Sequence, residues 1–280
     1  MRENSLHPRT ITPENVYQEA NQANRRLIHG MLDDLTLPGS AILEGRNLVD
    51  LYERSQDGAS CLILMEHYSN FDIPCLYYLL ERQGLKHIGD SIVAIAGMKL
   101  NEESEFVNAF AEAYTRIVIY PSRALLRYHD SAQKQQEETR SRLINMAATR
   151  QMIRLKHDGH IVLVFPAGTR YREGNPDTKR GVKEVDSYLK LFDYAVFIGI
   201  AGNVLRLDPK GDMSKDLATR DLVLLDVSRP IDCREFREEC RATAPAGIDF
   251  KQHAADVVMN ELEKVHEETQ AERERRLSGR

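Results

Sequence analysis

Short apolar runs alternate with longer amphipathic segments along most of the chain. An apolar run bounded by polar turns is typical of a buried strand. Such runs occupy 61–65, 92–96, 117–120, 161–165, 195–201 and 222–227. The segments between them have helical patterning and occupy 74–83, 102–113, 132–157 and 182–192. Because strands that alternate with helices usually pair in parallel, we predict an α/β fold, with a largely parallel mixed sheet covered by helices.

The first fifty-odd residues have helical patterning and no such strand. Thr12-Pro13-Glu14 combines a hydroxyl N-cap, a proline in the first turn and an acid at the positive end of a helix. We therefore predict a helix from this point to about Asp34, ending before Pro38, and a second helix at 46–54.

The two ends of the chain complete the predicted organisation. We expect an N-terminal helical domain over 1–56 and an α/β domain over 57–280. A last helix is predicted from about Phe250. Its tail, 261–280, is highly charged, which is typical of a solvated and fraying helix end.

Composition indicates a globular, mildly acidic protein. With 42% hydrophobic residues in 280, the chain can bury a sizeable core, and a formal net charge of −5 argues against a general nucleic-acid binder. No pair of cysteines has C-x-x-C spacing. We therefore expect free, buried thiols in a reducing compartment. The cysteines are Cys61, Cys75, Cys233 and Cys240.

Nothing in the apolar pattern predicts export or a membrane span. The polar residues after Met1 contain no apolar core of a signal peptide. The longest apolar stretches, such as 194–202, are about half as long as a membrane helix. We expect a protein that is cytoplasmic, or one that touches a membrane only from its surface.

A histidine and an aspartate, His67 and Asp72, follow the first predicted strand on a strand-to-helix turn. The turn can fold back so that the carboxylate binds one imidazole nitrogen and leaves the other to take a proton. His29 and Asp34 have the same spacing inside a predicted helix, where they do not face each other. The position of His67 on a strand-to-helix turn therefore makes it a candidate general base. The alternative is that His67 only caps the helix after Pro74.

A second candidate loop follows the strand at 161–165. Pro166 and Gly168 predict a turn, and the glycine lets backbone amides approach an anion closely. Arg170 and Arg172 would point to the same side of an extended segment, where two guanidinium groups suit a phosphate dianion. A solvated basic loop is the alternative. Two such loops after parallel strands favour a ligand site, because ligands bind at the carboxyl ends of these strands.

Both loops resemble motifs of the glycerolipid acyltransferase family. Residues 66–72, Glu-His-Tyr-Ser-Asn-Phe-Asp, resemble its N-H-x-S-x-x-D motif, and residues 165–170, Phe-Pro-Ala-Gly-Thr-Arg, resemble its F-P-E-G-T-R motif. The resemblance implies that the histidine, oriented by the aspartate, deprotonates a glycerol hydroxyl that attacks an acyl thioester. It implies no metal and no cofactor. Carried over, His67 and Asp72 are catalytic, and the acceptor site includes Gly168, Thr169 and Arg170.

Within that family, the chain is most similar to the soluble plastid-type glycerol-3-phosphate acyltransferases, over roughly 40–205. They carry two arginines separated by one residue after P-x-G and have a helical N-terminal domain. The resemblance therefore adds Arg172 to the substrate-binding residues. Residues 96–99 resemble their A-G-x-R stretch and 117–123 a strand that ends in a basic phosphate-binding patch. These segments and the first motif add Lys99, Arg123 and Ser69.

Three positions depart from the family pattern. Glu66 replaces the usual asparagine, and Ala167 replaces the usual glutamate by a small residue, as in the plastid branch. Ala124 stands where that branch has a histidine, so Arg123 would bind phosphate without it. The roles implied for His67 and the arginines do not depend on these changes.

The resemblance implies a glycerol-3-phosphate 1-O-acyltransferase of phospholipid synthesis. Its partners would be glycerol 3-phosphate, an acyl thioester of acyl carrier protein or coenzyme A, and transiently a membrane surface, with no nucleic acid. We expect an apolar acyl groove between the N-terminal helices and the sheet. The strongly acidic acyl carrier protein would need a basic surface. Lys179, Arg180 and Lys183 are one candidate, and a solvated face is the alternative.

Other functions stay open. The acceptor could be 1-acylglycerol 3-phosphate, which requires membrane docking, and the lack of an obvious amphipathic anchor counts against it. A metal-dependent hydrolase could use His67 with His157 and His160, although no H-E-x-x-H pattern occurs. The third alternative is a non-catalytic phosphate- or lipid-binding protein. The pair of His67 and Asp72 favours an enzyme, because binding alone needs neither.

Overall fold

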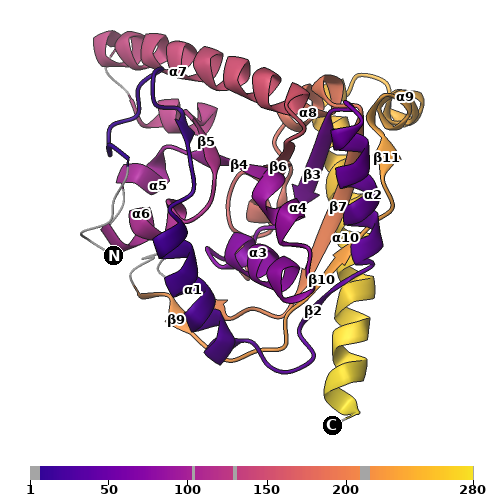
Figure 1. Cartoon of the computed structure of the whole chain (residues 1–280). Helices are drawn as coiled ribbons and strands as arrows, with labels where there is room; N and C mark the ends of the chain where they lie inside the picture. The colour runs from indigo at the N-terminus through magenta and orange to yellow at the C-terminus, as the bar shows by residue number, and fades with distance from the viewer. Residues whose placement is uncertain (1–6, 103–104, 129–130, 209–214, 280) are drawn as a thin grey trace.

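A mixed sheet with helices on both faces forms the body of the molecule (Figure 1). The computed structural model describes residues 7–102, 105–128, 131–208 and 215–279. Within them, a sheet of nine strands has the order β1-β5-β4-β6-β3-β7-β10-β2, and β11 also pairs with β7. Strands β5, β4, β6, β3 and β7 are parallel neighbours. The prediction of an α/β fold with a largely parallel sheet is confirmed.

The strands are short and the helices vary widely in length. The strands of the sheet are β1 (Tyr17–Gln18), β2 (Ala41–Leu43), β3 (Cys61–Met65), β4 (Ile92–Gly97), β5 (Arg116–Ile119), β6 (Ile161–Val164), β7 (Tyr194–Ala201), β10 (Leu224–Val227) and β11 (Ile231–Asp232), and β8 (Leu205–Arg206) pairs separately with β9 (Leu217–Ala218). The helices are α1 (Gln22–Leu35), α2 (Gly45–Gln56), α3 (Asp72–Arg82), α4 (Lys86–Ser91), α5 (Lys99–Glu102), α6 (Glu105–Ala111), α7 (Ser131–His157), α8 (Val185–Leu191), α9 (Cys233–Thr243) and α10 (Phe250–Ser278), with 3₁₀ turns η2 (Ser122–Arg127) and η3 (Pro176–Lys179).

The core has two layers, one on each face of the sheet. On β3, Ile63 packs in the layer that includes α1 to α4, whereas Leu62 and Leu64 pack in the layer that includes α7, α8 and α10. All five residues of β3 are buried, which explains its unbroken apolar run. Each predicted strand is present within two residues of its expected bounds. The four cysteines are free and buried, as expected.

The N-terminal segment differs from the prediction. A helix does not begin at Thr12, because its backbone N–H donates to the Asn15 side chain in a turn. The chain then pairs as β1 with β5, and α1 begins only at Gln22, where the Asn21 side chain caps the Ala23 and Asn24 amides. The predicted helix start was wrong because strand pairing with a distant segment overrides a local capping signal.

Residues 1–56 were predicted to be helical, but two strands of the sheet come from them. β1 lies at one edge of the sheet and β2 at the other, parallel to β10. Ile28 of α1 and Leu48 of α2 are fully buried in the core on one face of the sheet. These contacts bind the segment to the sheet, and the domain boundary at residue 56 stays a prediction.

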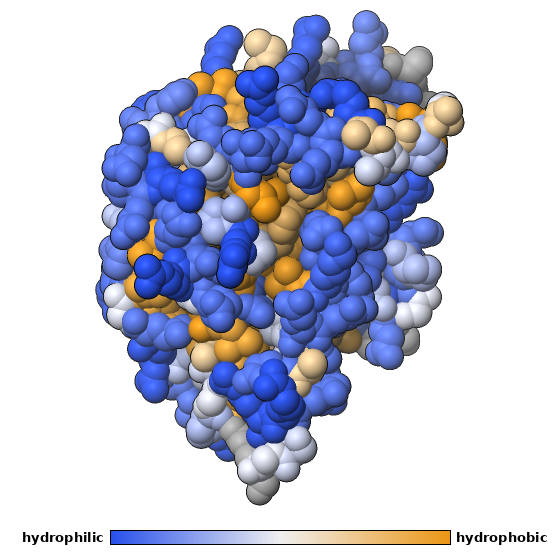
Figure 2. Space-filling model, turned by 90° about the vertical axis from the view of Figure 1, so that its right-hand side faces the viewer, coloured by the Kyte–Doolittle hydropathy of each residue, from blue (hydrophilic) through white to orange (hydrophobic). Residues whose placement is uncertain are grey.

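The charged C-terminal tail is not a fraying end. α10 continues to Ser278, and its Arg273 pairs with Asp221 and donates to the Leu222 carbonyl. α10 crosses β7 so closely that a Cβ on Gly199 would lie 2.8 Å from the backbone nitrogen of His266. The side of the molecule that carries α2 and α10 is mostly hydrophilic, with hydrophobic residues gathered in its middle (Figure 2).

Within the described ranges, no helix combines the length and the apolar content that a bilayer crossing requires.

Candidate active site

The first motif loop leaves β3 at the carboxyl edge of the sheet and holds the predicted imidazole–carboxylate pair. His67 Nδ1 lies 2.8 Å from Asp72 Oδ2, so the predicted contact is present. The same Oδ2 accepts from the amides of Tyr68 at 2.6 Å and Ser69 at 2.9 Å. Asp72 is also the first residue of α3, where the helix dipole favours a carboxylate. With Nδ1–H donating to Asp72, Nε2 carries the lone pair that can accept a proton.

His29 and Asp34, which have the same spacing, do not form a pair, as predicted. His29 lies in α1, and its Nδ1 is 3.0 Å from Glu81 of α3, not bound to Asp34. Burial lowers the pKa of His29, which favours the neutral imidazole. The spacing alone therefore does not create a histidine–aspartate pair; the strand-to-helix turn does.

The two motif loops meet. The Phe165 ring stacks on the His67 imidazole, with centroids 3.9 Å apart and planes 10° from parallel. The Tyr171 amide donates to the His67 carbonyl at 2.7 Å. A small cavity of about 20 Å³ lies between the loops and the C-terminal helix. Its walls include Glu66, His67, Tyr68, Pro166, Ala167, Tyr171, Lys179 and Met259.

The two arginines of the second loop do not point to the same side. Arg170 is buried, and its Nη1 lies 2.8 Å from Asp216, whose side chain is 3% exposed. Arg172 is exposed, and its amide donates to Thr178 Oγ1 at 2.9 Å. The expectation of two guanidinium groups on one side was wrong, because the ion pair with Asp216 turns Arg170 inward.

The structure places the remaining predicted residues in two settings. Ser69 is buried, and its hydroxyl donates to Asp72 Oδ1 at 3.1 Å, so it fixes the loop itself. Gly168 is exposed with a φ of +62°, a conformation that favours glycine, and Thr169 next to it is half-buried. Lys99 begins α5 after β4, and Arg123 lies in η2 after β5; both are exposed.

The strand order brings these residues to one edge. Since β5, β4, β6 and β3 are parallel neighbours in that order, their carboxyl ends share an edge of the sheet. Arg123, Lys99, Arg172 and His67 each follow one of these ends. His67 and these exposed cations therefore lie on the same edge of the sheet.

Glu66, the departure from the family's asparagine, is a buried carboxylate with three partners. Its oxygens accept from the Tyr68 hydroxyl at 2.9 Å, the Ile200 amide at 2.8 Å and His266 Nδ1 at 3.0 Å. The hydrogen bond to Glu66 raises the pKa of His266. Burial and the nearby carboxylate raise the pKa of Tyr68 far beyond neutrality, so its hydroxyl remains a donor.

Sequence reasoning missed His266 and Asp216. His266 lies on α10, 200 residues from Glu66, and Asp216 lies 46 residues from Arg170. No local pattern marks either residue as part of the site. Lys179 was proposed for a basic docking surface, but it pairs with Glu263 of α10.

Across the described parts of the chain, no group of three or more histidine, cysteine, aspartate or glutamate side chains is arranged to hold a metal ion.

Comparison with known proteins agrees with the geometry. A comparison with curated proteins found no match. A family model described as Acyltransferase matches residues 47–197, more than half of the chain, and this range includes both motif loops. The chain therefore belongs to the acyltransferase family.

Proposed function

We propose that this acyltransferase transfers a fatty acyl chain from an acyl thioester to the 1-hydroxyl of glycerol 3-phosphate, in phospholipid synthesis. The observation that carries the proposal is the hydrogen-bonded pair of His67 and Asp72, at the sheet edge that also presents exposed cations. A base beside cations suits an acceptor that has both a hydroxyl group and a phosphate group.

His67 acts as the general base. Its Nε2 takes the proton of the glycerol hydroxyl as the oxygen attacks the thioester carbonyl carbon. The tetrahedral intermediate then collapses, the carbon–sulfur bond breaks, and the imidazolium returns the proton to the departing thiolate. Asp72 keeps Nδ1–H in place and stabilises the positive charge that forms on the ring. A positioned base typically contributes about 10²–10⁴-fold, and orientation of the substrates supplies more.

Exposed cations hold the phosphate. Arg172 lies on the loop whose backbone binds the His67 carbonyl, and Lys99 and Arg123 follow the neighbouring strands. Arg170 contributes through position, because its pair with Asp216 fixes the loop. The cavity of about 20 Å³ holds little more than one water, so the acceptor lies against the exposed rim of the site.

Identification of the product tests the proposal. Purified protein is incubated in vesicle-free buffer with glycerol 3-phosphate or 1-acylglycerol 3-phosphate, and with thioesters of acyl carrier protein or coenzyme A. We expect 1-acylglycerol 3-phosphate from the first acceptor. Faster turnover of the second acceptor would replace our proposal by the alternative acyltransferase function. No turnover with either acceptor, under conditions in which the protein is folded, would refute it.

A further inference from the structure

Helix α7 carries apolar side chains on its outer face as well as on its inner face. It lies along the periphery of the molecule (Figure 1). The inner apolar stripe, buried against the sheet, consists of Ile144, Ala148, Met152 and Leu155. On the opposite face Leu143, Met146 and Ile153 are 49%, 45% and 39% exposed. A surface helix normally carries polar residues on its outer face, so this second apolar stripe needs an explanation.

The same part of the helix is strongly basic. Residues 139–157 contain five arginines and lysines and no acid, in a chain with a net charge of −5. Arg142 and Arg150 are exposed, and within the described ranges neither pairs with an acid. Arg150 lies in the outer apolar stripe, four residues after Met146. The outer face of α7 therefore combines exposed apolar side chains with positive charge.

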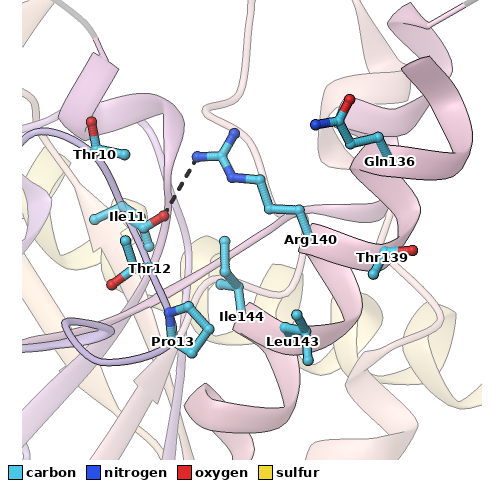
Figure 3. A pocket seen from close by; sticks show the side chains of 9 residues that line it. All are labelled: Thr10, Ile11, Thr12, Pro13, Gln136, Thr139, Arg140, Leu143 and Ile144. Atoms are coloured by element: carbon cyan, nitrogen blue, oxygen red, sulfur yellow. Dashed lines mark hydrogen bonds between the residues drawn. The ribbon is translucent and has the colours of Figure 1, made fainter. Parts of the chain in front are cut away.

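An apolar recess lies beside this face (Figure 3). It has a volume of about 480 Å³ and lies between the 10–13 segment and α7. Ile11 and Pro13 face Leu143 and Ile144 across it, and Arg140 donates to the Ile11 carbonyl at 3.4 Å. Because Leu143 belongs both to the recess and to the outer stripe, the two apolar surfaces are continuous.

We propose that α7 docks this protein onto an anionic lipid surface. Leu143, Met146 and Ile153 enter the boundary between headgroups and acyl chains, and Arg142 and Arg150 reach the lipid phosphates. Basic helices with an apolar face bind membranes in this way, through apolar burial and attraction to anionic lipids. The proposal concerns binding alone, and it holds whichever acceptor the enzyme uses.

A lipid surface fits better than an acidic partner helix. The exposed apolar residues lie along one helix at the periphery of the molecule, over about 15 Å. An amphipathic partner helix is usually bound in a groove between two elements, whereas the outer face of a single basic helix can enter a deformable lipid layer.

Vesicle binding tests the proposal. The wild-type protein is sedimented with phosphatidylcholine vesicles that contain or lack phosphatidylglycerol. We expect binding to the anionic vesicles and a decrease in this binding at high salt. Arg142→Gln/Arg150→Gln should weaken it on the order of 30-fold, since each basic residue near an anionic leaflet contributes about fivefold. Met146→Glu/Ile153→Glu should abolish it, because the acids are repelled and the apolar contact is lost.

Matched controls separate docking from misfolding. Ile248→Glu places the same acid at a site that is 50% exposed, in the loop between α9 and α10, and Arg234→Gln/Arg241→Gln removes the same charge from α9. Both should bind like the wild type, and all variants should keep the wild-type melting temperature. Turnover of glycerol 3-phosphate in vesicle-free buffer is measured alongside, so failure of docking is distinguishable from failure of the proposed function.

Three results would overturn the docking proposal. The first is equal binding of wild type to both kinds of vesicle, or binding to neither. The second is an equal loss of binding in the control variants. The third is binding of an acidic acyl carrier protein that the α7 variants lose, with no binding of vesicles.

Discussion

Asp72→Asn removes one negative charge while it can keep the local hydrogen bonds. Oδ2 of Asp72 accepts from His67, Tyr68 and Ser69, whereas Oδ1 accepts from the Ser69 hydroxyl. An asparagine with its oxygen in the place of Oδ2 preserves the first three bonds. Its amide NH₂ can donate to the Ser69 hydroxyl oxygen, which reverses the fourth. The substitution therefore tests the charge and not the geometry.

The magnitude follows from the separation of the charges. In the transition state an imidazolium faces the carboxylate across a 2.8 Å contact. Unit charges about 4 Å apart attract by about 4 kcal/mol at an effective dielectric constant of about 20. His67 is 17% exposed, so solvent screens part of this attraction. We therefore expect a loss of about 2–4 kcal/mol, which lowers kcat roughly 30- to 1,000-fold.

The assay compares Asp72→Asn with Asp72→Ala in steady-state kinetics and in urea unfolding. Alanine leaves the Tyr68 and Ser69 amides without an acceptor, at about 1–3 kcal/mol each. Asp72→Ala should therefore lose stability as well as activity, whereas Asp72→Asn should lose activity alone, with unchanged KM values. A kcat for Asp72→Asn within threefold of wild type would refute the proposed role of the charge.

Three further predictions concern the neighbouring side chains. His67→Ala should fold normally and lose about 10²–10⁴-fold in kcat, with His157→Ala as an exposed control; a mutant that retains its rate would rule out the base. Arg172→Ala should raise the KM for glycerol 3-phosphate about 10-fold or more and spare the KM for the thioester, with the exposed Arg229→Ala as its control. An effect on the KM for the thioester alone would contradict the proposed role of Arg172 in phosphate binding. His266→Gln tests the buried pair with Glu66. The pKa of His266 is raised above its ordinary value of 6.5. The pair with Glu66 therefore contributes fully to the free energy of unfolding below pH 6.5, and this contribution is lost as pH rises through the raised pKa. The difference in free energy of unfolding between wild type and His266→Gln should therefore decrease from pH 6 to pH 9 in urea unfolding. A difference that does not change with pH would contradict a charged pair of His266 and Glu66.

The sheet and the first motif loop could be predicted because their signals are local. The five residues of β3 form a continuous apolar run, since helices cover both faces of the strand. His67 and Asp72 contact each other within one turn that directly follows this strand. The partner strands of β1 and β2 could not be predicted in the same way. Their registers depend on segments about 100 and 180 residues away.

The pattern of α7 shows a different limit of sequence reasoning. Its inner stripe and its outer stripe are both apolar. Because these stripes lie on opposite faces, the sequence shows no one-sided apolar pattern with the period of a helix. The sequence therefore shows no amphipathic anchor, and this absence argues against an acceptor held in a membrane. The structure separates the two stripes by showing which face packs on the sheet. With an exposed apolar face in place, that objection no longer holds.

The buried charges around the site show why the residues that support the His67 loop could not be predicted. Glu66 could be recognised in the sequence as a departure from the family pattern, but a carboxylate next to the base has no evident use there. The structure supplies the reason: the C-terminal helix brings His266 across β7 at Gly199, where a larger residue would not fit. The carboxylate then holds the Tyr68 hydroxyl, the Ile200 amide and this helix together. Asp72 holds the Tyr68 amide, so the loop that carries His67 is fixed by a carboxylate at each end. A neutral asparagine at position 66 could bind the amide but would leave a protonated His266 without its counter-charge. The acid at position 66 and the histidine 200 residues later are therefore one feature of this protein, and replacing either one alone should loosen both the helix and the loop.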